Sequence, residues 1–451
     1  RLYDADGKLL AEWHEKLGPA QSTFVLDSKE VRKRFNLPEF CGQLFIHATK
    51  AAGHDIVKYA LDAYGDESHM LSCTHDANSW PADYYAGLPA PDEGEDVVLW
   101  VQNSQPFPIP EGEIALNIMG EGEVCRLKHG IPPFATYRLS VAELLPKAHW
   151  PQQVEIACGK YLVRPRYEVF KKGSPARRRM AHVNVERDDL KVDPKLSTLK
   201  EMGKGHILPA PILPLDHYKS LALPTPMGRN QQHLPLMALV YDSKGQKQAE
   251  QRLGNLLRNH AQLLDVDKVL NGKRLEGGFG HVEFLYDFSA GAEADGWMHG
   301  LFRYVDRKTG HAAESSFGSH MFNSALVYKN EPQSYAGRPP GLSTRLFLRL
   351  GVAPYDTFCH LIYPASTPWH ETSDTAFLLT AQDGTEVATH KVKIPCSGSH
   401  YWKVSEVFSA DQLKKARDGY IIVRDSTCRL FGYHGLLSGE QAFSLDHMFG
   451  F

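Results

Sequence analysis

Residues 3–42 read YDADGKLLAEWHEKLGPAQSTFVLDSKEVRKRFNLPEFCG, and residues 241–280 read YDSKGQKQAEQRLGNLLRNHAQLLDVDKVLNGKRLEGGFG. Aligned without gaps, the two stretches share ten identical residues in forty positions. Average residue usage would give about two or three such matches by chance. The sequence therefore predicts that one structural unit occurs twice in this chain.

Further matches follow in the same order along both copies. Their spacing drifts only where loops could absorb insertions, as expected of an internal repeat. We therefore expect a first half at residues 1–187 and a second half at residues 237–451. The matched pairs are His75-x-x-Asn78 with His320-x-x-Asn323, Tyr85-Ala86-Gly87 with Tyr335-Ala336-Gly337, Val163-Arg164 with Val423-Arg424, and His182 with His447.

The local pattern of the sequence is that of β-structure. Residues 281–288 alternate, so that Val282, Phe284 and Tyr286 share one face of a strand. Residues 297–305 are expected to form the partner strand, and helical pattern is sparse, with candidates at 51–64, 251–264 and 410–416. The predicted fold is all-β or β-rich, with tandem β-sandwich-like modules and few short helices. A weaker repeat within each half suggests two lobes per half, four in all.

Residues 188–236 are predicted to be a proline-rich linker between the halves. Prolines such as Pro209 and Pro211 exclude a helix or a central strand. The segment is nevertheless apolar, because Leu208, Ile212 and Leu213 favour burial. We therefore expect residues 207–215 to run extended and largely buried against the halves.

The composition limits the classes of partner. The formal net charge is -3, which disfavours nucleic acid because phosphate binding needs a basic surface. No segment approaches the roughly 18 apolar residues of a membrane span. The seven cysteines are scattered and never spaced as C-x-x-C, so we expect reduced thiols and a cytoplasmic location. The chain begins at Arg1 rather than Met, and a removed signal peptide remains open.

The usual catalytic and nucleotide-binding motifs do not occur, so any chemistry must come from residues that the fold brings together. The first candidate set consists of polar residues that recur in both halves. Imidazole suits proton transfer near neutral pH and the ligation of transition metals, and Asp446 or Glu186 could add a carboxylate. The alternative is that these residues satisfy buried backbone groups. The set comprises His75, Asn78, His182, Arg164, His320, Asn323, Arg424 and His447.

The second candidate set lies on the polar face of residues 281–288 and on the expected partner strand. An acid, a base, a guanidinium and an indole on one sheet face could bind a sugar or form a catalytic floor. The first half has Phe45 where the second has Glu283, as in an active copy beside a degenerate one. The alternative is a solvated face with cross-strand ion pairs. The catalytic candidates are His281, Glu283, Asp287 and His320, and the ligand-binding candidates are Trp297, His299 and Arg303.

Two function classes stay open at this point. The first is a non-catalytic binding or assembly protein that engages a carbohydrate, lipid or protein partner, since sandwich modules commonly do this. The second is a hydrolase, lyase or hydratase with a His/Asp/Glu site in the second half or at the seam between the halves. The sequence specifies no cofactor, metal or oligomeric state.

Overall fold

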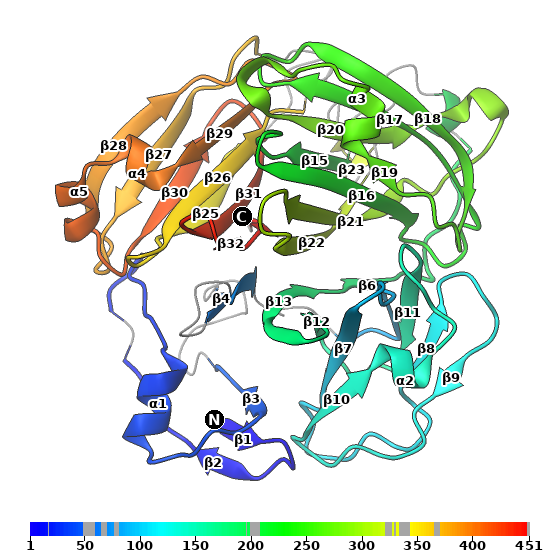
Figure 1. The fold of residues 1–451 in the computed structure, drawn as a ribbon, viewed down its shortest axis with the longest axis vertical. Helices are drawn as coiled ribbons and strands as arrows, with labels where there is room; N and C mark the ends of the chain where they lie inside the picture. The colour runs from blue at the N-terminus through cyan, green and yellow to red at the C-terminus, as the bar shows by residue number, and fades with distance from the viewer. Residues whose placement is uncertain are drawn as a thin grey trace.

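The structure, a computed structural model, describes the chain except for residues 17, 48–58, 65–69, 76–80, 195, 199–207, 321–326, 329–330, 333–342, 365–369 and 449–451. Short antiparallel strands dominate the described residues, which confirms the predicted β-rich class. The strands form four lobes, named here A (residues 2–75), B (84–185), C (208–320) and D (344–447). The lobes are arranged as a ring, with A and B below C and D in Figure 1.

Lobe C is a complete two-sheet sandwich. One sheet has the strand order β15-β20-β17-β18 and the other β19-β16-β21-β22. Its single α-helix is α3 (Val266–Leu270), N-capped by the side chain of Asp265. The strands are β15 (Leu208–Ile212), β16 (Tyr218–Pro226), β17 (His233–Asp242), β18 (Lys247–Leu257), β19 (Leu264–Asp265), β20 (Gly280–Tyr286), β21 (Trp297–Asp306) and β22 (Ala312–His320), with 3-10 turns η2 (Glu276–Gly278) and η3 (Phe288–Ala290).

Lobe D has the same arrangement. Its sheets have the orders β25-β30-β27-β28 and β29-β26-β31-β32, with β33 added to β31. Its helices are α4 (Val404–Val407) and α5 (Ala410–Lys415). The strands are β25 (Thr344–Arg349), β26 (Asp356–Ile362), β27 (Thr375–Thr380), β28 (Glu386–Val392), β29 (Ser399–Lys403), β30 (Tyr420–Asp425), β31 (Phe431–Ser438), β32 (Ala442–Phe443) and β33 (Asp446–His447). The short pair β23 (Val327–Tyr328) and β24 (Glu331–Pro332) lies between lobes C and D in the chain.

Lobe B repeats this order once more. Its sheets are β10-β7-β12-β13 and β14-β6-β11-β8-β9, and its helix is α2 (Val141–Leu144). The strands are β6 (Tyr84–Pro89), β7 (Glu95–Gln102), β8 (Ala115–Ile118), β9 (Cys125–Arg126), β10 (Thr136–Ser140), β11 (Gln153–Ala157), β12 (Arg166–Lys171), β13 (Ser174–His182) and β14 (Asn184–Val185). The 3-10 turn η1 (Leu196–Thr198) follows the lobe.

The described part of lobe A is a smaller version of lobe C. Its sheets are β2-β1-β3 and β4-β5, and its helix is α1 (Ser28–Arg34), N-capped by Asp27. The order β2-β1-β3 matches β18-β17-β20 of lobe C, where the ten shared residues predict it. The strands are β1 (Leu2–Asp4), β2 (Leu9–Ala11), β3 (Gly42–Leu44), β4 (Ala60–Tyr64) and β5 (Leu71–His75).

When the strands are numbered from one within each lobe, lobes B, C and D have the same pair of sheets. In each lobe, one sheet has the strand order 1-6-3-4 and the other has the order 5-2-7-8. The shared order extends to details, because α2, α3 and α4 all follow strand 5 of their lobes. The same strand order therefore occurs in three individual lobes, so it does not only relate the first half of the chain to the second.

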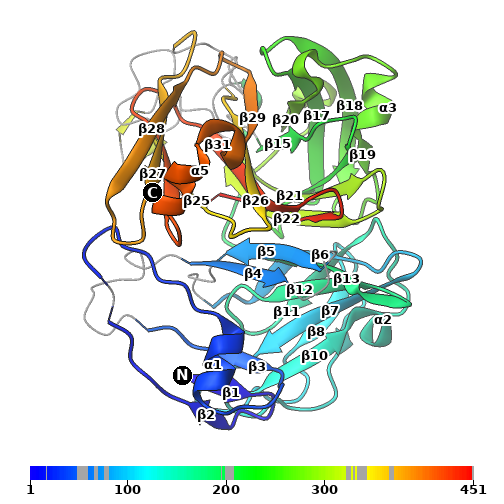
Figure 2. The ribbon, with the colours of Figure 1, turned by 60° about the vertical axis from the view of Figure 1, so that its left-hand side comes forward.

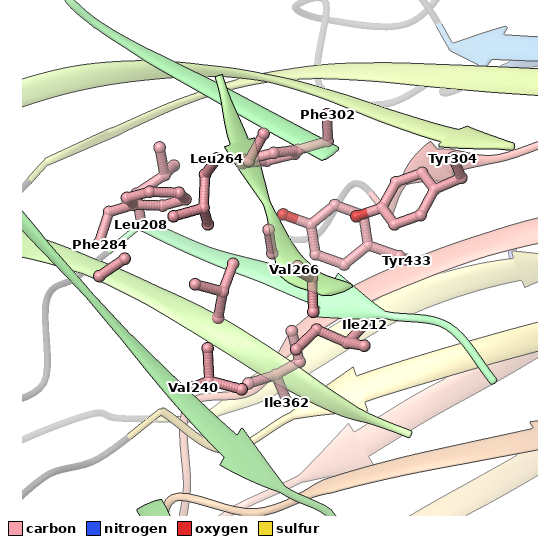
Figure 3. Close-up of a cluster of buried hydrophobic side chains, with 14 of the residues drawn as sticks. Leu208, Ile212, Val240, Leu264, Val266, Phe284, Phe302, Tyr304, Ile362 and Tyr433 are labelled. Atoms are coloured by element: carbon pink, nitrogen blue, oxygen red, sulfur yellow. The ribbon is translucent and has the colours of Figure 1, made fainter. Parts of the chain in front are cut away.

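Apolar side chains hold lobes C and D together as one core. The largest buried cluster contains Val240 and Phe284 of lobe C with Ile362 and Tyr433 of lobe D (Figure 3). The Tyr433 hydroxyl donates to the carbonyl of Pro209 at 2.6 Å, which ties β15 to lobe D. Separate clusters fill lobe B and the interior of lobe D.

The structure places residues 208–236 differently from the linker that we expected. Leu208–Ile212 is indeed extended and buried, but it is the edge strand β15 of lobe C, and β16 and β17 also lie before residue 237. The edge position explains the two prolines, since an edge strand needs ladder partners on one side only. The second sandwich pair therefore begins at residue 208.

Two of the expected helices are also wrong. Residues 251–257 belong to β18 and residues 60–64 to β4, while residues 51–58 of the first expected helix lie outside the described residues. The helix predicted at 410–416 is present as α5. Residues 251–257 follow a tight turn, and pairing with β17 outweighs their local helical pattern.

All seven cysteines are free thiols, and Cys41 is the exposed one. Within the described residues, no helix has the length and apolar character to cross a membrane.

Candidate metal centre

Strands β5, β13, β22 and β33, one near the end of each lobe, meet at the centre of the ring. Strand β13 lies beside β5 and β22 (Figure 2). Strand β33 contacts both β22 and β5. Each of these strands ends at a histidine: His75, His182, His320 and His447. The residues that pair with these histidines on the neighbouring strands are equivalent too. His75, His182 and His320 pair with the first residues of β4, β12 and β21, which are Ala60, Arg166 and Trp297, and His447 pairs with Tyr433 near the start of β31. The lobe repeat therefore brings histidines from distant parts of the chain to one place.

Three of these histidines and one carboxylate form a compact buried cluster. His75, His182, Asp446 and His447 each offer one ligand atom, and these atoms all lie within 4.8 Å of one another. The ring of His75 lies 4.4 Å from those of His182 and His447, centroid to centroid. His75, His182 and Asp446 are 3%, 1% and 2% exposed. The cluster draws on both halves of the chain and is shielded from water.

Hydrogen bonds define which nitrogen of each imidazole carries the proton. Nδ1 of His75 lies 2.7 Å from Asp446 Oδ2, while its Nε2 faces Nη1 of Arg164 at 3.2 Å. An arginine can only donate, so Nε2 of His75 accepts and Nδ1 donates to Asp446. Nδ1 of His447 lies 3.5 Å from the carbonyl of Met448, which can only accept. In both residues the lone pair is therefore on Nε2.

His182 has the same pattern. Its Nδ1 lies 3.2 Å from the Thr74 hydroxyl, and its Nε2 is a buried nitrogen with no hydrogen-bond partner. A buried imidazole nitrogen without a partner pays an uncompensated desolvation cost. Nitrogens of His281, His299, His360 and His434 share this feature, but among these buried nitrogens only Nε2 of His182 belongs to the compact cluster with Asp446. Nε2 of His182 can therefore bind a ligand in the tautomer in which Nδ1 donates to the Thr74 hydroxyl, which can accept as well as donate.

Asp446 is fixed by several donors. Its Oδ1 accepts from the backbone N–H of His447 at 2.8 Å and from the Ser315 hydroxyl at 3.3 Å, while Oδ2 holds His75. Arg164 adopts a left-handed backbone conformation with φ 38°. A carboxylate that holds Nδ1 of a histidine and leaves Nε2 for a metal is a common outer contact in metal sites.

Burial keeps the imidazoles of His182 and His447 neutral. It lowers the pKa of His447 to about 3 and the pKa of His182 well below its usual value, with the neighbouring His75 acting in the same direction on both. Burial also raises the pKa of Asp446 to about 6, although His447 opposes the shift. Neutral imidazoles are the form that binds metals, so no proton needs to leave His182 or His447 before a metal binds near neutral pH.

Other members of the first predicted set lie apart from this centre or outside the described residues. Arg164 is at the centre, but Arg424 is exposed within β30, because its strand corresponds to β11 rather than to the loop that carries Arg164. Asn78 and Asn323 lie outside the described residues, as does the segment containing Tyr335. The backbone of His320 ends β22, and its side chain is not described. Glu186 pairs instead with Arg258 between lobes B and C.

The second predicted set does not form one pocket. Strands β20 and β21 belong to different sheets of lobe C, because the connection between them crosses from one sheet to the other. His281 and Glu283 are therefore buried, 3.1 Å apart, on the sheet that faces lobe D. On the other sheet, Arg303 pairs with Glu314 towards lobe B, and His299 is buried with its pKa lowered to about 3, chiefly by burial.

The remaining members of that set lie at the periphery of lobe C. Asp287 caps the turn η3 and pairs with Arg252 at 3.3 Å. The ring of Trp297 is covered by the guanidinium of Arg187, at 5.2 Å. A single catalytic floor formed by these six residues is thus absent from the structure.

Sequence reasoning missed two contributors to the centre. Thr74 and Ser315 hold His182 and Asp446 in place. Thr74 directly precedes His75, as Asp446 precedes His447. Thr74 could therefore have been predicted as part of the centre from its position before a recurring histidine. Ser315 lies within β22, and only the ring arrangement brings it to Asp446.

A comparison of the chain with models of known protein families finds no match, and no curated protein sequence matches it. Function therefore has to be argued from the geometry of the centre itself.

Proposed function

We propose that this protein binds a divalent transition metal ion at the centre of its ring and acts as a metal-dependent hydrolase, lyase or hydratase. The observation that carries the proposal is the shared hydrogen-bond pattern of three converging histidines. In each, Nδ1 is engaged by the protein, and the buried Nε2 of His182 has no partner at all. Imidazole nitrogens suit zinc, copper, iron or nickel.

The donor set resembles that of a catalytic site more than that of a structural one. If Asp446 stays on Nδ1 of His75 and the Arg164 guanidinium moves off Nε2 of His75, three histidine nitrogens bind the ion and one position remains open. An ion with an open position lowers the pKa of bound water towards neutral pH. Arg164, which lies 3.2 Å from Nε2 of His75, would place a positive charge beside that position and favour an anionic ligand. The site lies at the seam between the halves, where one of the two predicted function classes puts it.

The test is metal binding by the purified protein, measured by elemental analysis and by titration with Zn²⁺ and Co²⁺. We expect one ion per chain and a higher melting temperature in its presence. His182→Gln should weaken binding by at least about 100-fold. His360→Gln is the matched control, because His360 is equally buried but lies between lobes C and D. Tight stoichiometric binding that survives in His182→Gln would exclude this site.

A second measurement separates an open site from a closed one. With Asp446 as an outer contact, Asp446→Asn should weaken binding by about 10–100-fold and leave the visible spectrum of the Co²⁺ protein similar. Added azide should then change that spectrum, because it can enter the open position. A spectrum that ignores azide and collapses in Asp446→Asn would indicate four protein ligands and a structural ion.

The second candidate is a non-catalytic binding or assembly protein that engages a carbohydrate, lipid or protein partner. The observation that favours a protein partner is an exposed apolar face on lobe A, where Leu44 and Ile46 are 38% and 52% exposed. We also propose that the lobes arose by duplication, supported by the common strand order, and that the protein is cytoplasmic, supported by its free thiols.

A further inference from the structure

Two arginines of lobe B contact the candidate metal centre. Arg164 lies in the loop between β11 and β12, and Arg166 begins β12, where it pairs with His182 across the ladder. Nη1 of Arg164 lies 3.2 Å from Nε2 of His75, and Nη2 of Arg166 donates to the backbone carbonyl of the same histidine at 3.1 Å. Both arginines are half-buried. Two positive charges therefore lie between the buried histidines and solvent-accessible surface.

Backbone contacts fix the point from which the Arg164 side chain extends. The buried hydroxyl of Tyr85 donates to the carbonyl of Leu162 at 2.8 Å and accepts from the backbone N–H of Arg164 at 3.1 Å. The carbonyl of the next residue, Pro165, accepts from the N–H of Val183 at 3.0 Å. These bonds hold Arg164 in its left-handed backbone conformation, with φ 38°. A change of rotamer can therefore move the guanidinium while the loop stays in place.

The Arg164 guanidinium occupies an atom that a metal ion would need. Nε2 of His75 is one of the three histidine nitrogens of the metal site, and in this structure it accepts from Arg164. A single lone pair cannot serve a hydrogen-bond donor and a metal ion at the same time. A hydrogen bond from a charged donor is worth about 10–100-fold in an equilibrium constant. Metal binding therefore displaces Arg164, and the competition lowers the metal affinity by up to that factor.

Displacement leaves positive charge that the nearby described carboxylates do not balance. Among the described residues, the compact cluster contributes one carboxylate, Asp446, against Arg164, Arg166 and a divalent ion. The carboxylate of Asp62 in lobe A is already paired with Arg349 of lobe D. Like charges close together in a partly buried site repel strongly. An anion beside the ion offsets this charge, and guanidinium groups pair best with the two oxygens of a carboxylate or a phosphate.

Building on the metal site of the proposed function, we propose that Arg164 is a switch that makes the centre bind its metal ion and an oxyanion substrate as a coupled pair. Without metal, Arg164 holds Nε2 of His75. With the ion bound, Arg164 pairs with the carboxylate or phosphate group of the substrate, and Arg166 adds a second positive charge. Since the oxyanion draws Arg164 away from His75, it tightens metal binding, and by linkage the ion tightens oxyanion binding by the same factor.

The experiment measures the affinity of the purified full chain for Co²⁺ with and without an oxyanion. The probes are acetate and methyl phosphate, compared with chloride at equal ionic strength because salt screens charged sites. In the parent protein, at least one oxyanion should tighten Co²⁺ binding by about fivefold or more. The oxyanion with the larger effect identifies the substrate group as a carboxylate or a phosphate.

Arg164→Met separates a switch from an arginine that only supports its loop. Methionine, like arginine, carries a β-carbon, so the left-handed backbone costs about the same. Without its competitor, the variant should bind Co²⁺ about tenfold more tightly in chloride and lose most of its response to oxyanions. Removal of a merely structural side chain would weaken metal binding instead. Arg424→Met is the matched control, because Arg424 is the repeat partner of Arg164 but is exposed within β30, and it should change neither quantity.

Arg166→Met tests the second arginine. Arg166 bonds to the backbone carbonyl of His75 rather than to a ring nitrogen, so its loss should weaken the response to oxyanions without tightening Co²⁺ binding in chloride. Melting temperatures of the metal-free proteins establish that all variants are folded.

The outcomes separate this inference from the proposed function. If the parent binds no metal ion, the proposed function fails and the switch fails with it. If the parent binds one ion, but Arg164→Met binds it no more tightly or responds to oxyanions as the parent does, the switch alone is overturned. A parent that binds one ion and responds to neither oxyanion also overturns the switch and leaves the metal site standing.

Discussion

Lobes A and C have closely matching sequences over forty positions, yet lobe C encloses a core and lobe A exposes the same face. The residues that the two lobes share do not determine how deeply this face is buried, because they act on the backbone of the turn and of the strand pair. Asp4 and Asp242 each accept from two backbone N–H groups of the following turn. Gly42 and Gly280 each leave no room for a side chain, since a Cβ would lie 2.0 Å from the carbonyl of Tyr3 or Tyr241.

The residues that decide burial are not shared. Leu44 and Val282 are both apolar, but 38% of Leu44 is exposed and 1% of Val282. What differs is the neighbour across the sandwich, which β15 and β16 provide in lobe C alone among the described residues. A turn and its strand pair can therefore recur in two lobes while the core that they serve depends on strands elsewhere.

The largest expected difference between the two lobes comes from truncating matched apolar residues. Phe284→Ala should lower the free energy of unfolding by about 3–5 kcal/mol, because it leaves a cavity in the core shared by lobes C and D. Ile46→Ala, at the aligned position, should cost below about 1 kcal/mol. Urea denaturation of both variants measures the difference, and equal costs would mean that lobe A has a core of its own.

The seams around the two lobes should also differ. Glu314 of lobe C is fully buried and accepts from Arg179 and Tyr167 of lobe B and from Arg303, at 2.8, 2.9 and 2.5 Å. Glu314→Gln removes the buried carboxylate that Arg179 and Arg303 share, although Arg179 keeps Glu95 and Arg303 keeps Asp92 at 3.6 Å, and it should cost about 3 kcal/mol.

The matching contact of lobe A is a neutral side chain. Gln43 donates to the carbonyls of Asn103 and Phe134 in lobe B at 3.0 and 2.5 Å. Gln43→Ala should cost about 1–3 kcal/mol, since carbonyls lose a donor but no charge is stranded. Urea denaturation at pH 7 compares the two variants, and a larger cost for Gln43→Ala would reverse the ranking of the seams.

The sequence allowed the β-rich class to be predicted, and the shared strand order agrees with the ten matches in residues 3–42 and 241–280. Alternation and turn residues are local signals, so they identify strands such as β20 and β27 well. They do not say which strands share a sheet. This is why β21 was expected beside β20, and why β15 and β16, whose prolines indicate a linker, were not expected within a sandwich.

Four of the residues at the centre, His75, His182, His447 and Arg164, were predicted as a set because they recur. Recurrence works here since the histidines end β5, β13 and β33, which lie at corresponding places in their lobes. The same reasoning failed for Arg424, because Arg424 lies within β30 whereas Arg164 lies in the loop after β11, the strand that corresponds to β30. The closed ring, which makes neighbours of Asp446 and His75, depends on contacts between residues 371 positions apart, and no local pattern encodes them.

A smaller difference should appear on acidification. His360, between lobes C and D, is fully buried, and burial lowers its pKa to about 3, with His281 and His400 acting in the same direction. The unfolded chain binds a proton near pH 6.5, so the folded state loses stability as the pH falls below 6.5 towards 3. The equivalent position between lobes A and B is Trp100, which does not titrate.

The contribution of His360 amounts to about 2 kcal/mol between pH 7 and pH 5. His360→Phe should therefore reduce the loss of stability over this range by that amount, as measured by urea denaturation at both pH values. Phe358→Leu, in the same strand β26, is the control and should leave the pH dependence unchanged, because Phe358 is a buried side chain that does not titrate. An unaltered pH dependence in His360→Phe would mean that His360 gains its proton in the folded protein.

The smallest difference concerns two matched helix caps. Asp27 accepts from the backbone N–H of Lys29 at the start of α1, and Asp265 from that of Asp267 at the start of α3. Replacing such a cap by alanine costs about 1 kcal/mol of helix stability. Helix α3 buries Val266 and Leu270, whereas α1 buries none of its residues. Loss of the cap on α3 is therefore transmitted to the core, and loss of the cap on α1 stays local.

Asp265→Ala should accordingly lower the global free energy of unfolding by about 1 kcal/mol, and by slightly more if the contact with Lys219 at 3.0 Å contributes. Asp27→Ala should leave the urea midpoint unchanged and speed hydrogen exchange in residues 28–34 by about fivefold, the rate equivalent of 1 kcal/mol. The two helices begin at aligned aspartates, so any difference comes from what each helix packs against. If Asp27→Ala shifted the midpoint as Asp265→Ala does, α1 would be coupled to global unfolding, and the contrast between the lobes would be confined to their sheets.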